Sequence, residues 1–251
     1  MSRSAVRPVT CVRSSTRWWR AGTAVGEQPP RRGEIHVWSV PLSVHAEDMP
    51  ALRGVLSVRE RARADRFQLP ADRRRFTVSR YALRSVLGDC SGLAPRSLEF
   101  RYGRQGKPYL DSPGAPHFSL SHSGELSLIA VCRDEPVGVD VEYALRVPDV
   151  MYELVDAFFS PTDRRQLLAL PAESQRDAFF RCWTRKEALV KALGVGLLSK
   201  DGRADGRWSL HQIEPAAGYV GAVAVAVRRT GWTVVTRPFA RAAGAVSAER
   251  P

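Results

Sequence analysis

The stretch Val137–Tyr143 constrains the fold and chemistry of this chain most, because valine alternates along it with Gly138, Asp140 and Glu142. Successive side chains of a β-strand point to opposite faces, so the valines form one face and the two carboxylates share the other. We expect the valine face to be buried. Two acids at this spacing suit a hard cation such as Mg²⁺, although an exposed acidic face is the commoner meaning of the pattern alone.

Composition places the chain among ordinary globular proteins. Its 251 residues are 44% hydrophobic and 25% charged, which is enough for one large domain or two small ones. No apolar run reaches membrane-spanning length, so we expect no membrane association. The four cysteines lack the spacing of a metal site or a disulfide scaffold, which predicts a protein of the reducing cytoplasm.

Residues 1–33 carry much of the net charge of +12, with seven arginines and one glutamate. They show no hydrophobic periodicity, so we predict a disordered basic tail at 1–33 and a second flexible tail at 240–251. The tail and the net charge suggest a rival hypothesis, a nucleic-acid-binding protein. That hypothesis leaves the two acids of the central strand unexplained.

The remaining chain reads as a mixture of helices and strands. A capping box at Ser57–Glu60 predicts a helix to about Phe67, and Pro70 begins a longer helix that we expect to stop at Gly88. Further helices are expected from Ser160 and from Ser174, the latter running to Leu193 before the glycines at 194 and 196. Strands are expected at 34–40, 98–102, 118–121, 126–132, 137–143, 219–227 and 232–236.

The order of these elements predicts an α+β fold of two similar halves, at 34–139 and 140–239. Each half contains a strand, helices and an apolar strand pair. We also expect the strands at 126–132 and 137–143 to form a hairpin, because residues 133–136 read as a turn.

Two other stretches carry chemical groups. Phe179, Trp183, Glu187 and Lys191 are spaced by four and share one helix face, where the rings desolvate the charges, although a plain salt bridge is the simpler interpretation. Phe118–Gly124 offers hydroxyls, an imidazole and a glycine, which suit phosphate binding.

The motifs together resemble the 4′-phosphopantetheinyl transferases, specifically those of the surfactin-synthetase-activating type. The resemblance covers about Ile35 to Phe239, and the W-x-x-K-E-A-x-x-K block combined with G-V-D-x-E is highly specific. The motifs follow one order along the chain: Gly106–Pro108, Phe118–Gly124, Val137–Glu142, Phe158–Thr162, Trp183–Ala188 with Lys191, and Gly194–Leu197.

The resemblance implies an enzyme that moves 4′-phosphopantetheine from coenzyme A to a serine of an apo acyl or peptidyl carrier protein. The reaction releases 3′,5′-ADP, and it serves secondary metabolism such as polyketide or nonribosomal peptide biosynthesis. Asp140, Glu142 and Glu187 match the positions that hold Mg²⁺. Glu187, or a metal-bound water, deprotonates the carrier serine, and Lys191 steadies the pyrophosphate.

The resemblance also assigns the coenzyme A contacts. Arg75 and His122 match positions that hold the 3′-phosphate, and Ser121 matches another phosphate contact. Lys107 and Pro108 match the turn on the adenine side. On the first basic helix, Arg63 matches one of two phosphate-binding cations, whereas Glu60 stands at the other position. Arg59 or Arg61 is the alternative cation there. The expected site lies in the cleft between the halves, and the internal similarity favours a monomer.

Overall fold

The computed structural model describes residues 29–145, 150–195, 208–227 and 231–239. Nearly all of the predicted basic tail, the tail at 240–251 and the predicted helix stop at Gly196 lie outside these ranges. No helix in the described segments combines the length and the apolar character needed to cross a membrane.

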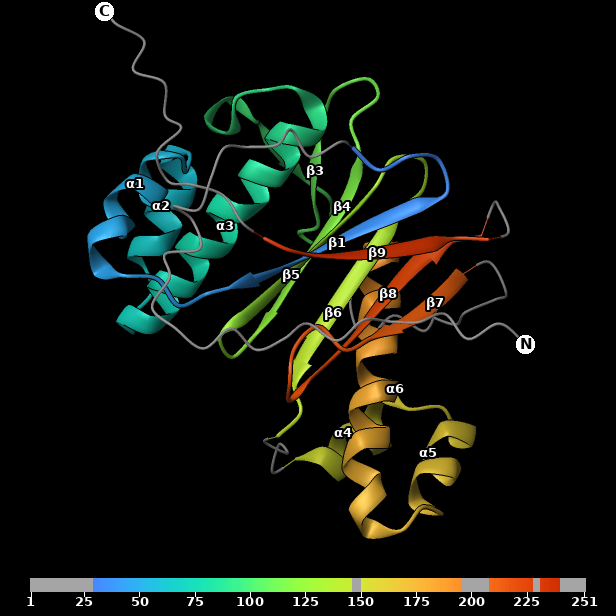
Figure 1. Cartoon of the computed structure of the whole chain (residues 1–251). Coiled ribbons are helices and arrows are strands. Elements are labelled where there is room, and N and C mark those ends of the chain that lie inside the picture. Colours follow the sequence, from blue (N-terminus) through green and yellow to red (C-terminus); the bar gives the residue numbers. More distant parts are fainter. Residues whose placement is uncertain (1–28, 146–149, 196–207, 228–230, 240–251) are drawn as a thin grey trace, which may run out of the picture.

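Two β-sheets packed face to face form the centre of the molecule (Figure 1). The first has the strand order β4-β5-β1-β9 and the second the order β6-β8-β7, while β2 and β3 form a separate hairpin. The mixed α+β class is therefore confirmed. The strands are β1 (Glu34–Pro41), β2 (Phe100–Tyr102), β3 (Pro108–Leu110), β4 (His117–Ser123), β5 (Leu126–Cys132), β6 (Val137–Tyr143), β7 (Trp208–Ile213), β8 (Tyr219–Ala226) and β9 (Thr233–Pro238).

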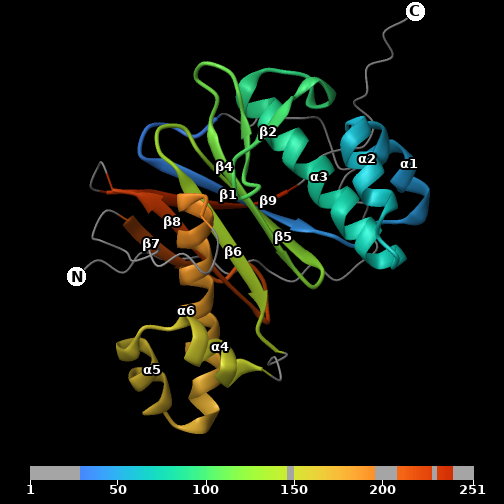
Figure 2. The ribbon, with the colours of Figure 1, turned by 180° about the vertical axis from the view of Figure 1, so that it is seen from behind.

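Helices cover the outer face of the first sheet. They are α1 (Met49–Gly54), α2 (Val58–Asp65) and α3 (Pro70–Ser91), and Figure 2 shows them from behind, with short 3-10 turns at Ala46–Asp48 and Pro95–Ser97. The predicted capping box at the start of α2 is confirmed, because Ser57 and Glu60 exchange side-chain to backbone hydrogen bonds of 3.2 and 2.9 Å.

The predicted stop of α3 at Gly88 is wrong. The helix continues to Ser91 and ends at Gly92, which takes the left-handed conformation with φ of 68°. Gly88 has a different purpose, since a Cβ atom there would lie 2.8 Å from the carbonyl oxygen of Leu93. The glycine lets the chain pack closely as it leaves the helix.

The predicted hairpin between β5 and β6 is also wrong. Strand β5 pairs with β1 and β4, whereas β6 pairs with β8 in the other sheet. The valine face of β6 packs against the first sheet, and Val137, Val139 and Val141 are fully buried. Burying this face between two sheets prevents β6 from joining the sheet of its sequence neighbour.

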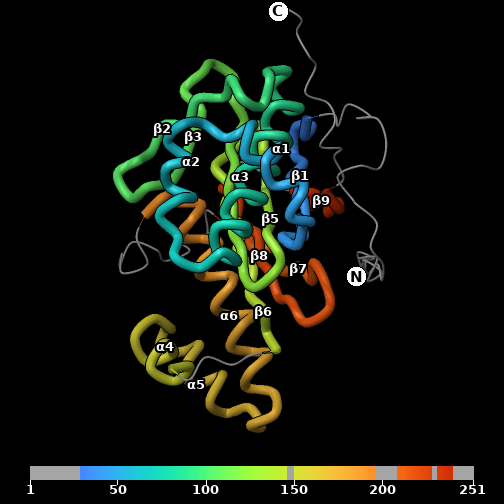
Figure 3. The backbone as a smooth tube through the Cα atoms, turned by 90° about the vertical axis from the view of Figure 1, so that its left-hand side faces the viewer, coloured from blue at the N-terminus to red at the C-terminus, as the bar shows by residue number. Residues whose placement is uncertain are grey.

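The long helix α6 (Ala172–Leu193) lies on the outer face of the second sheet. It begins at Ala172 rather than at Ser174, with Pro171 as its N-cap, and it ends at Gly194 with φ of 69°, as predicted. Helices α4 (Met151–Phe158) and α5 (Pro161–Leu168) surround its first turns, away from the sheets (Figure 3).

The division of the chain into halves stays a prediction. Its boundary at residues 139 and 140 falls inside β6, and the last strand, β9, lies parallel to β1 in the first sheet. The unpredicted strand β7 completes the second sheet.

Candidate active site

Gly138 brings helix α6 against the acidic face of β6. A Cβ atom at this position would overlap the carbonyl oxygen of Ala188 and the backbone of Ala192. Only glycine permits this contact, so the helix can rest directly on the strand. The approach places Lys191 of the helix beside Asp140 of the strand.

Asp140 is the centre of the site. Its side chain is 3% exposed, and its Oδ1 accepts hydrogen bonds from Lys191 Nζ at 2.6 Å and from Ser121 Oγ at 2.8 Å. Lys191 also donates to Ser121 Oγ at 2.8 Å. The other oxygen, Oδ2, is buried and has no hydrogen-bond partner within the described residues. One oxygen of this carboxylate is therefore hydrogen-bonded, and the other has no hydrogen bond from the described residues.

The three predicted metal ligands interact electrostatically. Burial raises the pKa of Asp140, against the opposing effects of Lys191 and Ser121. Burial also raises the pKa of Glu142 and of Glu187, and the charge of Asp140 raises both further. Lys191, together with Lys186 near Glu187, does not offset the burial of the three acids, so the cluster is short of positive charge.

The residues fit a divalent cation, although they do not form a complete cage. Among the described residues, no group of three or more His, Cys, Asp or Glu side chains is arranged to hold a metal ion. The orphaned Asp140 Oδ2 and the raised pKa values nevertheless mark the place where a cation would relieve repulsion. Carboxylate oxygens are the ligands that Mg²⁺ prefers, and it needs few of them when phosphates supply others.

A cavity of about 310 Å³ lies beside this cluster, between α2, α3, the turn after β2, strand β4 and the end of α6. It brings together five predicted cofactor-binding residues and several aromatic and aliphatic side chains. The five are Arg63, Lys107, Pro108, His122 and Lys191. An adjoining cavity of about 680 Å³ shares Arg63 and Arg80 with the first and adds two further arginines, Arg59 and Arg66.

Lys107 joins the two sides of this cavity. Its Nζ donates to the carbonyl oxygens of Val137 at 3.1 Å and Ala192 at 3.0 Å. Burial lowers its pKa to about 8. The carbonyl of Ala192 lies in the last turn of α6, where a cation is favoured by the helix dipole. Lys107 thus holds the turn after β2 against β6 and α6.

Arg63 and the imidazole of His122 are the groups of the cavity that we expect to be most available to an anion. Desolvation lowers the pKa of His122, and the neighbouring charges of Lys191 and Arg75 lower it further. Arg63 stacks over Phe76 at 5.3 Å, and no ion pair to an acid is found for it within the described residues.

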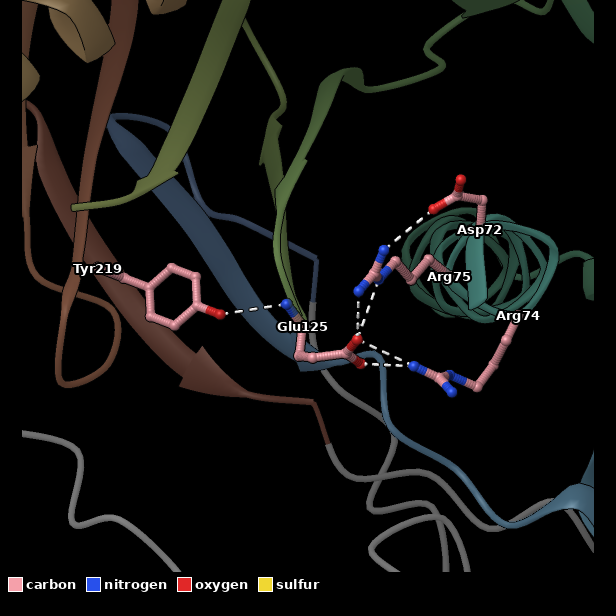
Figure 4. A network of polar contacts seen from close by, with 5 residues as sticks. All are labelled: Asp72, Arg74, Arg75, Glu125 and Tyr219. Carbon is pink, nitrogen blue, oxygen red and sulfur yellow. Dashed lines mark hydrogen bonds and ion pairs between the residues drawn. The ribbon is translucent and has the colours of Figure 1, made fainter. Parts of the chain in front are cut away.

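Arg75 lies outside the cavity wall and is already paired. Its guanidinium donates to Glu125 Oε1 at 2.7 Å and to Asp72 Oδ1 at 3.0 Å (Figure 4). Arg74 binds the same glutamate at 2.9 Å, and the Glu125 N–H donates to Tyr219 Oη at 3.1 Å. The hydrogen bonds of Glu125 to the two arginines and to Tyr219 hold α3 and β8 against the turn between β4 and β5. The phosphate role of Arg75 stays a prediction, and its charge is shared by two acids.

Glu60 stands at the position where the resemblance leads us to expect a phosphate-binding cation. Its carboxylate lies in a buried network of ion pairs. Arg80 Nε and Arg84 Nε donate to its two oxygens at 2.7 and 2.6 Å. Arg80 also stacks over Phe100 at 4.7 Å. Glu60 therefore anchors α2 to α3, and it lines the larger cavity as an acid paired with two arginines. Arg61 donates to Leu56 O, so it is directed away from the predicted phosphate site.

Ser119, Ser123 and Glu125 contact the site or its supports, but sequence reasoning did not single them out. The two serines could have been found, because serine alternates along Phe118–Ser123 and would share a face on a strand. No local pattern reveals Glu125, since its arginine partners are 50 and 51 residues away.

The comparisons with known proteins agree with this geometry. A family model described as the 4′-phosphopantetheinyl transferase superfamily matches residues 136–224, and one for the N-terminal part of 4′-phosphopantetheinyl transferases matches residues 44–134. The chain is 38% identical over 209 residues to the 4′-phosphopantetheinyl transferase HetI of Nostoc sp., covering 77% of this chain and 88% of that protein. The chain belongs to the 4′-phosphopantetheinyl transferase family.

Two Bacillus members of the family are similar over a smaller part. The 4′-phosphopantetheinyl transferase psf-1 of Bacillus pumilus is 33% identical, covering 64% of this chain and 72% of that protein. The 4′-phosphopantetheinyl transferase Sfp of Bacillus subtilis is 30% identical, covering 62% and 67%. The predicted resemblance is thus confirmed, and the chain is a phosphopantetheinyl transferase enzyme. The two family models meet just before β6, the strand that carries Asp140.

Proposed function

We propose that this enzyme transfers 4′-phosphopantetheine from coenzyme A to a serine of an apo acyl or peptidyl carrier protein, depends on Mg²⁺, and releases 3′,5′-ADP. The observation that carries the proposal is the undercompensated carboxylate cluster beside Lys191, at the edge of a cavity lined by cations. Family membership supports the transfer itself.

Asp140, Glu142 and Glu187 are the residues that would hold the cation. When bound, Mg²⁺ would neutralise charge on the pyrophosphate during displacement. The Asp140 Oδ2 atom supports this assignment, because it is a buried acceptor for which the described residues supply no hydrogen-bond donor.

Glu187 is the proposed proton acceptor. The carrier serine oxygen attacks the β-phosphorus of coenzyme A, and the bond from that phosphorus to the bridging oxygen breaks. The serine proton passes to the Glu187 carboxylate, and the electron pair leaves with 3′,5′-ADP. The raised pKa of Glu187 supports this role, since it brings the carboxylate closer to the pKa of an effective base near neutral pH.

Lys191 is proposed to contact the pyrophosphate and to stabilise the leaving group. Its side chain is 31% exposed and its ammonium is shared between Asp140 and Ser121, so a small movement would let it reach a phosphate oxygen. A fixed cation at this position stabilises charge that grows as the bond to the leaving group breaks.

The nucleotide end is proposed to occupy the adjoining cavities. Arg63 and His122 would contact the 3′-phosphate, and the turn with Lys107 and Pro108 would border the adenine. Arg59 and Arg66 add positive charge to the same region.

We further propose that the enzyme acts as a monomer in the cytoplasm. Its net charge of +12 suits an acidic carrier protein as partner, because opposite charges speed encounter. The rival nucleic-acid hypothesis depends on the arginines of residues 1–33, nearly all of which lie outside the described residues.

Incubation with coenzyme A, Mg²⁺ and a panel of apo carrier proteins tests the proposal. Mass spectrometry should detect the phosphopantetheine increment on at least one carrier, with an equal amount of 3′,5′-ADP. A chelator should stop the reaction, and added Mg²⁺ should restore it. Modification that continues at full rate in the chelator would remove the metal from the proposal, and modification of no carrier would contradict the activity.

A further inference from the structure

Strands β4 and β6 lie side by side but belong to different sheets, and no backbone ladder joins them within the described residues. Serine alternates along β4, so Ser119, Ser121 and Ser123 point to one face. All three hydroxyls contact β6. Side chains therefore replace the backbone hydrogen bonds that would join two strands of one sheet.

The partners of the three hydroxyls differ. Ser119 Oγ accepts from the backbone N–H of Val139 at 3.1 Å and touches no carboxylate. Ser121 Oγ donates to Asp140 Oδ1 at 2.8 Å. Ser123 Oγ donates to Glu142 Oε2 at 2.8 Å and accepts from the backbone N–H of Tyr143 at 3.1 Å.

Each carboxylate of β6 is thus held by a serine through one oxygen, and Trp183 makes a further side-chain hydrogen bond to Glu142. A hydroxyl that engages one oxygen restricts rotation of the carboxylate and leaves the second oxygen for another ligand. Asp140 shows this arrangement, since Oδ1 binds Ser121 and Lys191 while the buried Oδ2 has no partner. Groups that orient metal-binding carboxylates in this way tune metal affinity without touching the ion.

We propose that Ser121 and Ser123 are positioning residues that orient Asp140 and Glu142 toward a divalent cation, whereas Ser119 only fixes the register of β6. The proposal rests on the proposed metal-dependent function. It gives Ser121 a role toward Asp140, and the phosphate contact predicted from the sequence stays a prediction.

Ser123→Ala is the sharper test, because Ser121 also contacts Lys191 and its loss would disturb two groups. The dissociation constant for Mn²⁺ is measured by electron paramagnetic resonance, without carrier protein, beside the Mg²⁺ concentration for half-maximal transfer. We expect both values to rise about 10-fold to 100-fold in Ser123→Ala. The KM for coenzyme A should stay close to the wild-type value at saturating Mg²⁺.

Ser119→Ala is the matched control, with the same residue type on the same face of the same strand. It should lower the melting temperature, because the Val139 N–H loses its acceptor, and it should leave Mn²⁺ affinity unchanged. Ser123→Thr keeps a hydroxyl and should restore most of the metal affinity that Ser123→Ala loses.

Wild-type Mn²⁺ affinity in Ser123→Ala would overturn the proposal. Equal weakening in Ser119→Ala and Ser123→Ala would also overturn it, since the serines would then act only through strand packing. If the wild-type protein binds no Mn²⁺ and transfers without Mg²⁺, the metal part of the proposed function fails as well. That result is distinct, because the wild-type measurement alone reveals it.

Discussion

Glu60 and Asp140 are both buried carboxylates, with side chains 5% and 3% exposed, but their surroundings shift their pKa values in opposite directions. Burial raises the pKa of Glu60, yet Arg80, Arg84 and the Ser57 N–H together bring it below its usual value. Burial also raises the pKa of Asp140, and there Lys191, Ser121 and the Val141 N–H do not offset it, so the pKa stays above its usual value.

The difference in pKa distinguishes Glu60, whose role is structural, from Asp140, which we propose to bind a metal ion. The network at Glu60 is internally compensated, so it joins two helices and needs nothing more. The cluster at Asp140 lacks positive charge, which is costly in the free protein and useful only when a cation binds. The cations follow the same division, since Arg75 is paired with two acids and Arg63 with none in the part of the chain that the structure describes.

Asp140→Ala should show the largest effect on activity. Loss of the central ligand should reduce transfer at least about 10³-fold, because the metal contributes several kcal/mol to the displacement. The melting temperature of the metal-free protein should not fall, because an unfavourable buried charge is removed. Near-normal turnover with Mg²⁺ would show that Asp140 is not a metal ligand.

Glu187→Gln and Glu142→Gln should separate the two remaining acids. Loss of the proposed base should cost on the order of 10² to 10⁴ in kcat, whereas loss of Glu142 should cost less. Single-turnover rates at saturating coenzyme A measure both. Equal, small losses would contradict the proposed division of roles.

Glu60→Ala should have the opposite outcome to Asp140→Ala. Removing the acid leaves Arg80 and Arg84 buried without a counter-charge, which should lower the free energy of unfolding by about 3–5 kcal/mol. Urea denaturation measures the loss, and Mn²⁺ affinity of the folded protein is the control. A variant as stable as the wild type would mean that the buried network contributes nothing.

Arg63→Ala and Arg75→Ala compare an unpaired cation with a paired one. If Arg63 binds the 3′-phosphate, its loss should raise the KM for coenzyme A about tenfold or more and leave dephospho-coenzyme A unaffected. Arg75→Ala should change the KM for coenzyme A and for dephospho-coenzyme A equally, because the arginine forms an ion pair with Glu125. A loss confined to coenzyme A in Arg75→Ala would instead support the sequence prediction for that residue.

The pH dependence of stability should have opposite signs at the two sites and is the smallest effect. Glu60 has a lowered pKa in the folded state, so its stabilisation is present above pH 4.5 and is lost as pH falls through the folded value. The folded state holds protons on Asp140, Glu142 and Glu187 more tightly than the unfolded chain does, so stability falls as pH rises through their range.

Glu60→Gln should therefore reduce the dependence of the free energy of unfolding on pH below pH 4.5. Asp140→Asn should reduce that dependence at higher pH. Each group changes the slope by at most about 1.4 kcal/mol per pH unit. Metal-free denaturation curves at several pH values measure it. Identical slopes in both variants would remove the contrast between the sites.

Features that depend on residues close in sequence could be predicted. The alternation of Val137–Tyr143 specified a strand with a buried valine face, and Ser57 and Glu60 specified a helix start. Gly194 ended α6 where expected, whereas Gly88 did not end α3, because a glycine at a close contact resembles a glycine at a helix end. The motif order was enough to indicate the family.

The sequence by itself determined the longest helices, most of the strands, the family and five of the side chains around the cavity, because these follow from short periods, caps and motifs. Only the tertiary structure decided which groups pair across the molecule. It paired β6 with β8 instead of β5, and it placed Arg75 in an ion pair with Glu125. Such pairings join residues tens of positions apart, and they depend on how whole faces are buried, which no local pattern encodes.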